Sequence, residues 1–196
     1  MTARHVFVHH QQTDQREGDF KFCPVCGASL ILADLGGRHR PTCQACGYIQ
    51  FRNPAPTVSV LIVRDDKVLL GRRHGEPGRG TWSLPSGYIE WDDDLLLAAV
   101  REAKEETGLD VELTSMINVV SSLLSPRYHF LGIYFAARVL GGELSAGDDL
   151  DAVAWFPLAG PMPELGFEED AEVIRVYNQE GYQGMPVSLR MEPNRV

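Results

Sequence analysis

The sequence has no long hydrophobic run. Its longest uninterrupted apolar stretch, Leu95–Val100, is far shorter than the roughly 20 residues of a membrane-spanning helix, so we expect no membrane partner. The first twenty residues are polar and contain no apolar h-region, which predicts the absence of a secretory signal and a cytoplasmic location. No repeat or low-complexity segment is present. An apolar fraction of 44% with 23% charged residues is typical of a globular protein rather than a disordered one.

Basic residues are few relative to acidic ones. Lysine and arginine together number 18 against 27 aspartates and glutamates, which gives a formal net charge of −9. Sequence-independent binding of DNA or RNA requires clustered positive charge, so we expect no nucleic-acid partner. Only a local basic patch would change this expectation.

Cysteine is also scarce, but its four positions are regularly spaced. They form two C-x2-C pairs separated by sixteen residues, at Cys23, Cys26, Cys43 and Cys46. In a reducing compartment such pairs indicate a metal site, and four thiolates complete a tetrahedral shell around Zn²⁺ with no open position for water. The spacing therefore predicts structural zinc. Two disulfides, or thiols that merely pack, are the alternatives.

Changes in residue pattern divide the chain into segments. Residues 1–19 are polar and aperiodic, which is typical of a tail, and residues 20–54 contain the cysteine pairs and form the predicted zinc ribbon. The prolines of Asn53–Pro56 mark a boundary, because proline disrupts regular elements. We predict an α/β domain at 55–180, and a carboxy-terminal tail without a clear secondary-structure element at 181–196.

The second domain alternates strand and helix patterns. Thr57–Val63 and Lys67–Arg73 flank a turn at Asp65–Asp66 and predict a hairpin. Further strands are predicted at 109–124 (one or two strands), at 127–139, ended by Gly141–Gly142, and at 152–156. Helices are predicted at 94–107, with a carboxylate cap and a terminal Gly108, and at 168–180.

Three glutamates lie on one face of the first helix. At 100° per residue, Glu102, Glu105 and Glu106 fall within an arc of about 100°. Like charges at this spacing destabilise a bare helix, and bound Mg²⁺ or Mn²⁺ would remove the conflict. The alternative is a solvated helix face on which Lys104 and Arg101 are surface partners.

The region around this helix resembles the Nudix box, G-x5-E-x7-R-E-U-x-E-E-x-G-U, in which U is aliphatic. The spacing matches throughout, from Gly87 through Arg101–Glu102 and Glu105–Glu106 to Gly108–Leu109. Two positions depart from the pattern: Asp93 replaces the first glutamate, and Ala103 occupies the first aliphatic position. In addition, Ser86 stands where many relatives have a second glycine. The resemblance implies an α/β/α sandwich around a mixed sheet, joined here to a small amino-terminal zinc ribbon.

The resemblance also implies a reaction, the metal-dependent hydrolysis of a diphosphate linked to a nucleoside. Glu102, Glu105 and Glu106, with the carbonyl of Gly87, would hold Mg²⁺ or Mn²⁺, and Arg101 would hold a helix carboxylate in place. The acid that activates water is left open among three aspartates that could equally form a solvated turn. These are Asp148, Asp149 and Asp151.

Substrate-binding residues are expected around the box. Arg72, Arg73 and Arg79 are candidates for phosphate contacts. Arg72 and Arg73 point to opposite strand faces, so at most one of that pair can bind substrate, and we select Arg72 and Arg79. Tyr128, His129 and Phe167 could stack on a base or flavin ring, although aromatic residues at such positions are more often part of the core.

The ribbon narrows the substrate class by resemblance. CPxCG and CxxCGYI, followed by Asn53–Pro54, are similar to the ribbon of ADP-ribose and FAD diphosphatases. The SQPWPFPxS motif of NADH pyrophosphatases is replaced by SSLLSPR at 121–127. We therefore expect hydrolysis of a small-molecule nucleoside diphosphate derivative, ADP-ribose or FAD, with release of AMP. The alternatives are NADH, an oxidised nucleoside triphosphate, and a non-catalytic sensing or binding module. The family is also compatible with a homodimer.

Overall fold

The computed structural model describes residues 19–125, 128–147, 149–180 and 184–187. The predicted amino-terminal tail therefore lies outside the described residues except for Asp19. In the described part of the chain, no helix is both long and apolar enough to cross a membrane.

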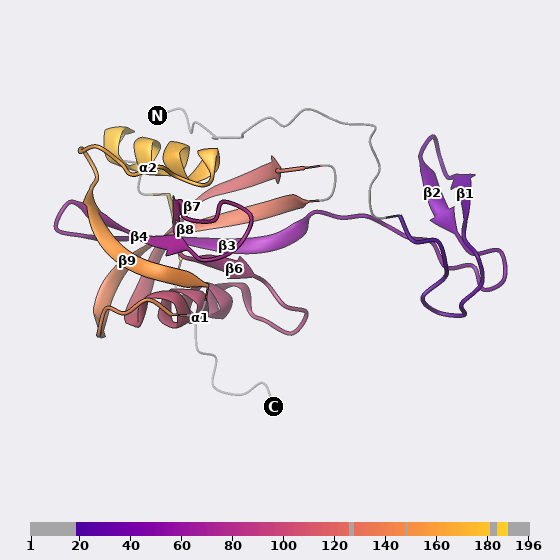
Figure 1. The fold of residues 1–196 in the computed structure, drawn as a ribbon, viewed down its shortest axis with the longest axis horizontal. Coiled ribbons are helices and arrows are strands. Elements are labelled where there is room, and N and C mark those ends of the chain that lie inside the picture. Colours follow the sequence, from indigo (N-terminus) through magenta and orange to yellow (C-terminus); the bar gives the residue numbers. More distant parts are fainter. Residues whose placement is uncertain (1–18, 126–127, 148, 181–183, 188–196) are drawn as a thin grey trace.

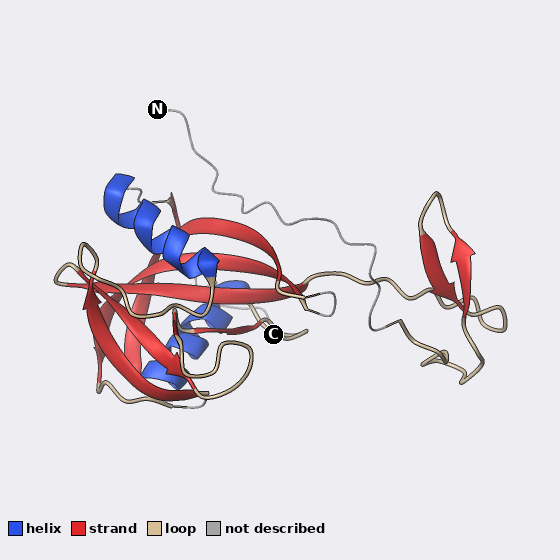
Figure 2. Cartoon of the chain, turned by 45° about the horizontal axis from the view of Figure 1, so that its top comes forward, coloured by secondary structure: helices blue, strands red, loops and turns tan. Residues whose placement is uncertain are grey.

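The cysteine-rich segment forms a small unit of its own. Strands β1 (Ile31–Asp34) and β2 (His39–Thr42) make an antiparallel hairpin between the two cysteine pairs. Each pair forms a tight turn in which a glycine N–H donates to the carbonyl of the first cysteine, Gly27 to Cys23 and Gly47 to Cys43, both at 2.9 Å. Both glycines have φ near +75°, which other residues rarely adopt. Figures 1 and 2 show this unit at the end of an extended segment.

A mixed sheet forms the centre of the larger domain. Eight strands pair in the described residues, and the main order is β10-β7-β8-β3-β4-β5, with β6 beside β3 and β9 beside β4. Among the named strands of the described residues, β3 and β8 are the one pair that runs parallel. The strands are β3 (Ala55–Arg64), β4 (Lys67–Arg73), β5 (Trp82–Ser83), β6 (Ser86–Tyr88), β7 (Leu109–Leu123), β8 (His129–Gly142), β9 (Leu150–Pro157) and β10 (Met185–Pro186).

Two helices cover opposite faces of this sheet, α1 (Leu95–Thr107) and α2 (Glu168–Glu180) (Figure 1). Residues along β3 alternate between them: Val58 and Val60 pack in the core beneath α1, whereas Leu61 packs in the core that includes Val173 of α2. The predicted α/β/α sandwich around a mixed sheet is therefore confirmed.

Three details differ from the sequence predictions. Pro56 lies inside β3, where its carbonyl accepts a bond from the Ile89 N–H at 3.2 Å; a proline near the start of a strand costs little pairing. Residues 109–123, which were expected to form one or two strands, form one. Gly141 and Gly142 do not end β8, because both still pair with β7. A short strand, β10, follows Gly181 and pairs with β7 at the sheet edge. The sequence there has no apolar pattern that would predict a strand.

The hairpin of β3 and β4 opens next to its turn. The two strands pair only at Val63–Val68 and Arg64–Lys67, and farther along β3 the partner on that side is β6. Asp65 and Asp66 both have positive φ, as a tight hairpin turn requires. The opening places Ser86 and Gly87 of β6 beside helix α1.

Candidate active site

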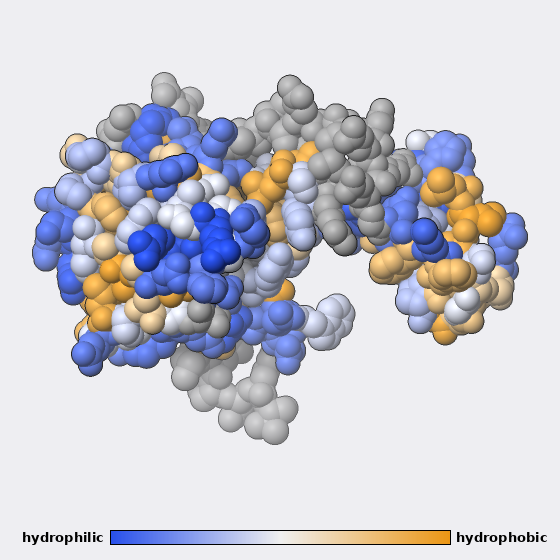
Figure 3. All heavy atoms as spheres, in the orientation of Figure 1, coloured by the Kyte–Doolittle hydropathy of each residue, from blue (hydrophilic) through white to orange (hydrophobic). Residues whose placement is uncertain are grey.

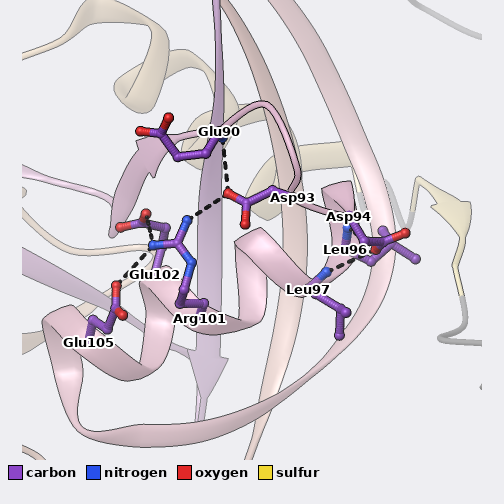
Figure 4. Close-up of polar contacts among 8 residues, drawn as sticks. All are labelled: Glu90, Asp93, Asp94, Leu96, Leu97, Arg101, Glu102 and Glu105. Carbon is purple, nitrogen blue, oxygen red and sulfur yellow. Dashed lines mark hydrogen bonds and ion pairs between the residues drawn. The ribbon is translucent and has the colours of Figure 1, made fainter. Parts of the chain in front are cut away.

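Local signals fix the position of α1. Asp94 caps the helix, since its Oδ1 accepts from the backbone N–H groups of Leu96 at 2.9 Å and Leu97 at 3.1 Å (Figure 4). Gly108 ends it in the left-handed conformation. The period of the helix then places Glu102 and Glu106 on its buried side, and leaves Glu105 nearer solvent.

Arg101 joins three carboxylates. Its Nη1 donates to Glu102 Oε1 at 2.8 Å and to Glu105 Oε2 at 3.0 Å, while its Nη2 donates to Asp93 Oδ2 at 2.9 Å (Figure 4). The backbone N–H of Glu90 donates to the same oxygen of Asp93, and this bond together with Arg101 lowers the pKa of Asp93. The shorter acid at this position therefore still ties the loop before α1 to the helix.

Glu106 is the most deeply buried of the three glutamates. Its side chain accepts from the Ser86 N–H at 3.0 Å, and the residue is 5% exposed. Burial raises the pKa of Glu106 to about 8, and the neighbouring charge of Glu102 adds to the rise. A buried acid so poorly compensated by positive charge is a suitable ligand for a divalent cation.

The carboxyl group of Glu102 leaves no room for a side chain at Gly87. A methyl group at Gly87 would overlap the carboxyl group of Glu102, so only glycine lets β6 approach this part of α1. The Gly87 backbone and the carboxylates of α1 thus form one oxygen-rich set of donors, which fits the preference of Mg²⁺ and Mn²⁺ for carboxylate and carbonyl ligands.

A cavity of about 240 Å³ adjoins these carboxylates on the α2 side of the sheet. Alternate residues of three neighbouring strands line it: Thr57 and Ser59 of β3, Val120 and Ser122 of β7, and Phe130, Gly132 and Tyr134 of β8. Glu106, Ser86 and Gly87 lie at its α1 side. Glu169 and Asp170 enter it from the first turn of α2.

The two adjacent arginines of β4 lie on opposite faces of the strand. Arg73 lines the cavity, where its Nε donates to the carbonyl of Pro77 at 2.7 Å and its guanidinium lies 5.0 Å from the centroid of the Phe167 ring. Arg72 is exposed on the other face. With Arg79 it lies near Asp151, whose pKa both residues help to lower after the larger effect of His74. The candidate arginine that faces the cavity is therefore Arg73 rather than Arg72 or Arg79.

The aromatic residues predicted to contact the substrate also differ in whether they line the cavity. Phe167 lines the cavity. Tyr128 is half exposed and does not line it. Its ring stacks parallel to that of Phe130, with centroids 6.3 Å apart, and Phe130 does line the cavity. His129 bonds through Nε2 to the hydroxyl of Ser121 at 2.8 Å.

The three aspartates proposed to activate water have different positions. Asp149 lines the cavity, and its charge contributes to the raised pKa of Glu106. Asp151 instead pairs with His74 Nδ1 at 2.7 Å. Asp148 lies outside the described residues.

Sequence reasoning did not find the acidic wall of the cavity. Asp170 accepts from the Leu84 N–H at 2.9 Å and from the Tyr134 hydroxyl at 3.2 Å, and Glu169 accepts from the Ser122 hydroxyl. Burial raises the pKa of Asp170 to about 7. The helical spacing of Asp170 with Ile174 and Tyr177 was an available signal, because it places the acid on the apolar face of α2.

The four cysteines converge. One sulfur atom from each residue lies within 4.8 Å of all the others, and the two closest pairs, Cys23–Cys46 and Cys26–Cys43, are 3.5 Å apart. A disulfide requires sulfurs about 2.05 Å apart. The described cysteines are all free thiols in this arrangement, which fits one tetrahedral zinc ion rather than two disulfides.

Comparison with known proteins places the chain in a family. A family model described as the NUDIX domain matches residues 53–177. The chain is similar to the ADP-ribose pyrophosphatase of Methanocaldococcus jannaschii, with 39% identity over 131 residues that cover 66% of this chain and 76% of the relative. It is also similar to the NAD-capped RNA hydrolase NudC of Pseudomonas aeruginosa, with 30% identity over 147 residues, and it spans about half the length of that relative.

A solved structure agrees with the sequence matches. The crystal structure of a NUDIX hydrolase from Nitrosomonas europaea superposes with a TM-score of 0.72 and 30% identity, covering 86% of this chain and 96% of the other. The family model spans more than half of the chain, and the box expected at 87–109 forms the carboxylate-bearing helix beside the cavity. The chain therefore belongs to the Nudix hydrolase family.

Proposed function

We propose that this Nudix hydrolase cleaves the diphosphate linkage of ADP-ribose or FAD and releases AMP. The observation that carries the proposal is the position of Glu106, a buried carboxylate that lies between an oxygen-rich set of metal ligands and a cavity of about 240 Å³. The similarity to an ADP-ribose pyrophosphatase over 76% of that protein supports the choice of substrate.

The residues of α1 and β6 would hold the catalytic metal. The carboxylates of Glu102, Glu105 and Glu106 and the carbonyl of Gly87 are the proposed ligands for Mg²⁺ or Mn²⁺. When bound, such an ion screens the negative charge of the diphosphate and acidifies the attacking water. Arg101 keeps Glu102 and Glu105 in fixed orientations, so the ligands are arranged before the substrate arrives.

Other residues of the cavity take the remaining roles. Arg73 offers positive charge to the phosphate oxygens, and its contact with Pro77 fixes its direction. Asp149 is the proposed acceptor of the proton from the attacking water, because it lies on the cavity near enough to act on the charge of Glu106. Phe130 and Phe167 supply apolar walls for the ring of the nucleoside.

The zinc ribbon would have a structural role. A unit of about 35 residues buries little apolar surface, and a metal ion compensates for the small core. We propose that Cys23, Cys26, Cys43 and Cys46 bind Zn²⁺.

The charge of this ribbon favours a second candidate function, the cleavage of an NAD-type diphosphate, including the cap of NAD-capped RNA. Residues 20–54 contain four basic residues and a single acid, although the chain as a whole is acidic. The ribbon also exposes Phe20, Phe22 and Phe51, and the guanidinium of Arg40 lies 4.7 Å from the Phe51 ring centroid. Figure 3 shows hydrophobic and hydrophilic side chains next to one another on the surface of this unit. Basic and aromatic side chains together are typical of surfaces that bind single-stranded nucleic acid.

A substrate panel tests both candidates. Purified protein would be incubated with ADP-ribose, FAD, NADH, NAD-capped RNA and an oxidised nucleoside triphosphate, each with Mg²⁺ or Mn²⁺, and products would be separated by chromatography. We expect AMP from ADP-ribose or FAD, and loss of turnover by about 100-fold or more in Glu106→Gln. A preference for triphosphates would contradict the proposal, and so would activity that Glu106→Gln retains. Preference for capped RNA would favour the second candidate.

A further inference from the structure

The segment between β8 and β9 bonds to the end of helix α1. The last four carbonyls of an α-helix have no partner within the helix, so other groups must donate to them. At the end of α1, the Gly147 N–H donates to the carbonyl of Glu106 at 3.2 Å, and the Ser145 N–H donates to that of Thr107 at 3.0 Å. The backbone of Glu106, a proposed metal ligand, is therefore bonded directly to this segment.

The contact between this segment and the helix leaves room only for glycine at Gly147. A methyl group there would lie 2.3 Å from the carbonyl oxygen of Glu105, and this obstacle is backbone that cannot rotate away. The φ angle of Gly147 is outside the left-handed range, so glycine is needed here for space and not for its backbone conformation. Any larger residue would therefore force the segment away from α1.

Asp149, the proposed proton acceptor, lies two residues beyond Gly147 in the same segment. The Leu150 N–H donates to the Gly147 carbonyl at 3.2 Å and closes a turn that contains Asp149. Asp149 lines the cavity, and its charge acts on the carboxyl of Glu106. A displacement of Gly147 would therefore displace the acid as well.

The other side of this turn is bonded to β4. The carbonyl of Asp149 accepts from the His74 N–H at 2.8 Å, and the His74 imidazole bonds through Nδ1 to Asp151 Oδ1 at 2.7 Å. Leu150 is buried and pairs with Arg73 in the sheet. The turn that contains Asp149 is thus held between the helix of the carboxylates and the strand that carries Arg73.

We propose that Gly147 is a positioning residue, which fixes Asp149 relative to the carboxylates of α1. The role of Asp149 requires it to lie within hydrogen-bond reach of the attacking water, so even a shift of about 1 Å in the turn would slow the reaction. The inference rests on the proposed function, in which Asp149 accepts the proton of that water. It adds the contact that sets the place of the base against the metal ligands.

Gly147→Ala tests this role, with Gly141→Ala as the matched control. Gly141 lies near the end of β8, and a methyl group there would meet no atom closer than Asp110 Oδ2 at 3.8 Å. We expect Gly147→Ala to lower kcat by roughly 10- to 100-fold, as for a misplaced base, while KM stays within about 2-fold. Gly141→Ala should keep the wild-type kcat. The assay uses ADP-ribose or, if that is not cleaved, the compound of the substrate panel that is cleaved fastest.

A double variant separates positioning from general damage to the fold. Asp149→Asn alone should lower kcat by about 100-fold or more. In that background Gly147→Ala should lower it by no more than about 2-fold further, because the base that it positions is already lost. The Mn²⁺ affinity of Gly147→Ala, measured by electron paramagnetic resonance, should match that of the wild-type protein.

Four results would overturn the inference. These are an unchanged kcat in Gly147→Ala, losses that multiply in the double variant, full activity in Asp149→Asn, and a fall in the Mn²⁺ affinity of Gly147→Ala. The last would mean that the substitution acts through the metal ligands. Circular dichroism and thermal unfolding would establish that the variants fold.

Amide exchange of the wild-type protein, followed by NMR, separates this inference from the proposed function. It requires neither turnover nor a variant that folds. The hydrogen bonds to α1 predict slow exchange of the Ser145 and Gly147 N–H groups. Slow exchange of both would support the inference even if neither ADP-ribose nor FAD were hydrolysed. Exchange as fast as in an unstructured peptide would overturn it even if ADP-ribose were a good substrate.

Discussion

The guanidinium of Arg101 lies 2.9 Å from the carboxylate of Asp93 and, through its other nitrogen, bonds to Glu102 and Glu105. One planar side chain thus spaces three acids that would otherwise repel each other. Arg101→Lys should lower kcat by about 10-fold or more, since one ammonium group cannot hold all three acids in this geometry. Steady-state kinetics and Mn²⁺ titration would measure the effect.

Asp93→Asn provides the comparison for that change. An asparagine oxygen can still accept from Arg101, so the loss should be smaller than in Arg101→Lys. Because the two residues act through one contact, the double variant should lose less than the product of the separate losses. Strictly multiplicative losses would show that the contact has no role in arranging the site.

Gly87→Ala should weaken the metal site. The added methyl group would overlap the carboxyl of Glu102 and push it out of position. We expect Mn²⁺ affinity, measured by electron paramagnetic resonance, to fall by about 10-fold or more, as when a ligand's support is lost. Gly75→Ala is the control, because no atom lies near a methyl group there and its φ is not positive. An unchanged Mn²⁺ affinity in Gly87→Ala would contradict the proposed ligand set.

Arg73→Ala and Arg72→Ala should behave differently although the residues are adjacent. Arg73 lines the cavity, whereas Arg72 is exposed on the other face of β4. Loss of a charged contact to phosphate should raise the KM for ADP-ribose by roughly 10- to 100-fold in Arg73→Ala, and Arg72→Ala should stay within about 2-fold of wild type. Equal effects in the two variants would refute the placement of the substrate.

The pH dependence of stability should reveal Asp170. Burial raises its pKa from 3.8 to about 7, so between these values the folded protein keeps a proton that the unfolded chain has lost. The free energy of unfolding should therefore decrease as pH rises from about 4 to about 7. In metal-free buffer Glu106 adds a similar decrease, because its pKa is also raised.

Asp170→Asn removes one of these two titrations. Its unfolding midpoint should therefore vary less steeply with pH than that of the wild-type protein, even if the substitution lowers stability at every pH. Urea titrations at pH 5, 6, 7 and 8 would measure the slope. Parallel curves for variant and wild type would mean that Asp170 does not titrate in this range.

Much of this site follows from local sequence rules. The Asp94 cap, the Gly108 terminus and the period of the helix together place Glu102, Glu105 and Glu106, and each of these signals is contained within a few residues. The strand at 67–73 was likewise predicted with its observed bounds, because its turn at Asp65–Asp66 is equally local.

What depended on packing was harder to predict. Alternation along β4 shows that Arg72 and Arg73 point apart, but which of them faces the cavity depends on how β9 and the loops surround that strand. The buried acids of α2 are a similar case. An acidic first turn is ordinary at an exposed helix end, and the burial of Asp170 results from contacts with Leu84 and Tyr134, which are 86 and 36 residues away in the chain.

Cys43→Ser should release the metal of the ribbon. Cys43 is almost fully buried and its sulfur lies 3.5 Å from that of Cys26, so its loss leaves three thiolates around the ion. Elemental analysis should find about one zinc per wild-type chain and far less in the variant, since structural zinc sites need all four ligands. The ribbon should then become sensitive to limited proteolysis, while residues 55–180 keep their fold because the two cores of that domain contain no cysteine. Zinc-free wild-type protein with a protease-resistant ribbon would show that packing alone holds the four cysteines together.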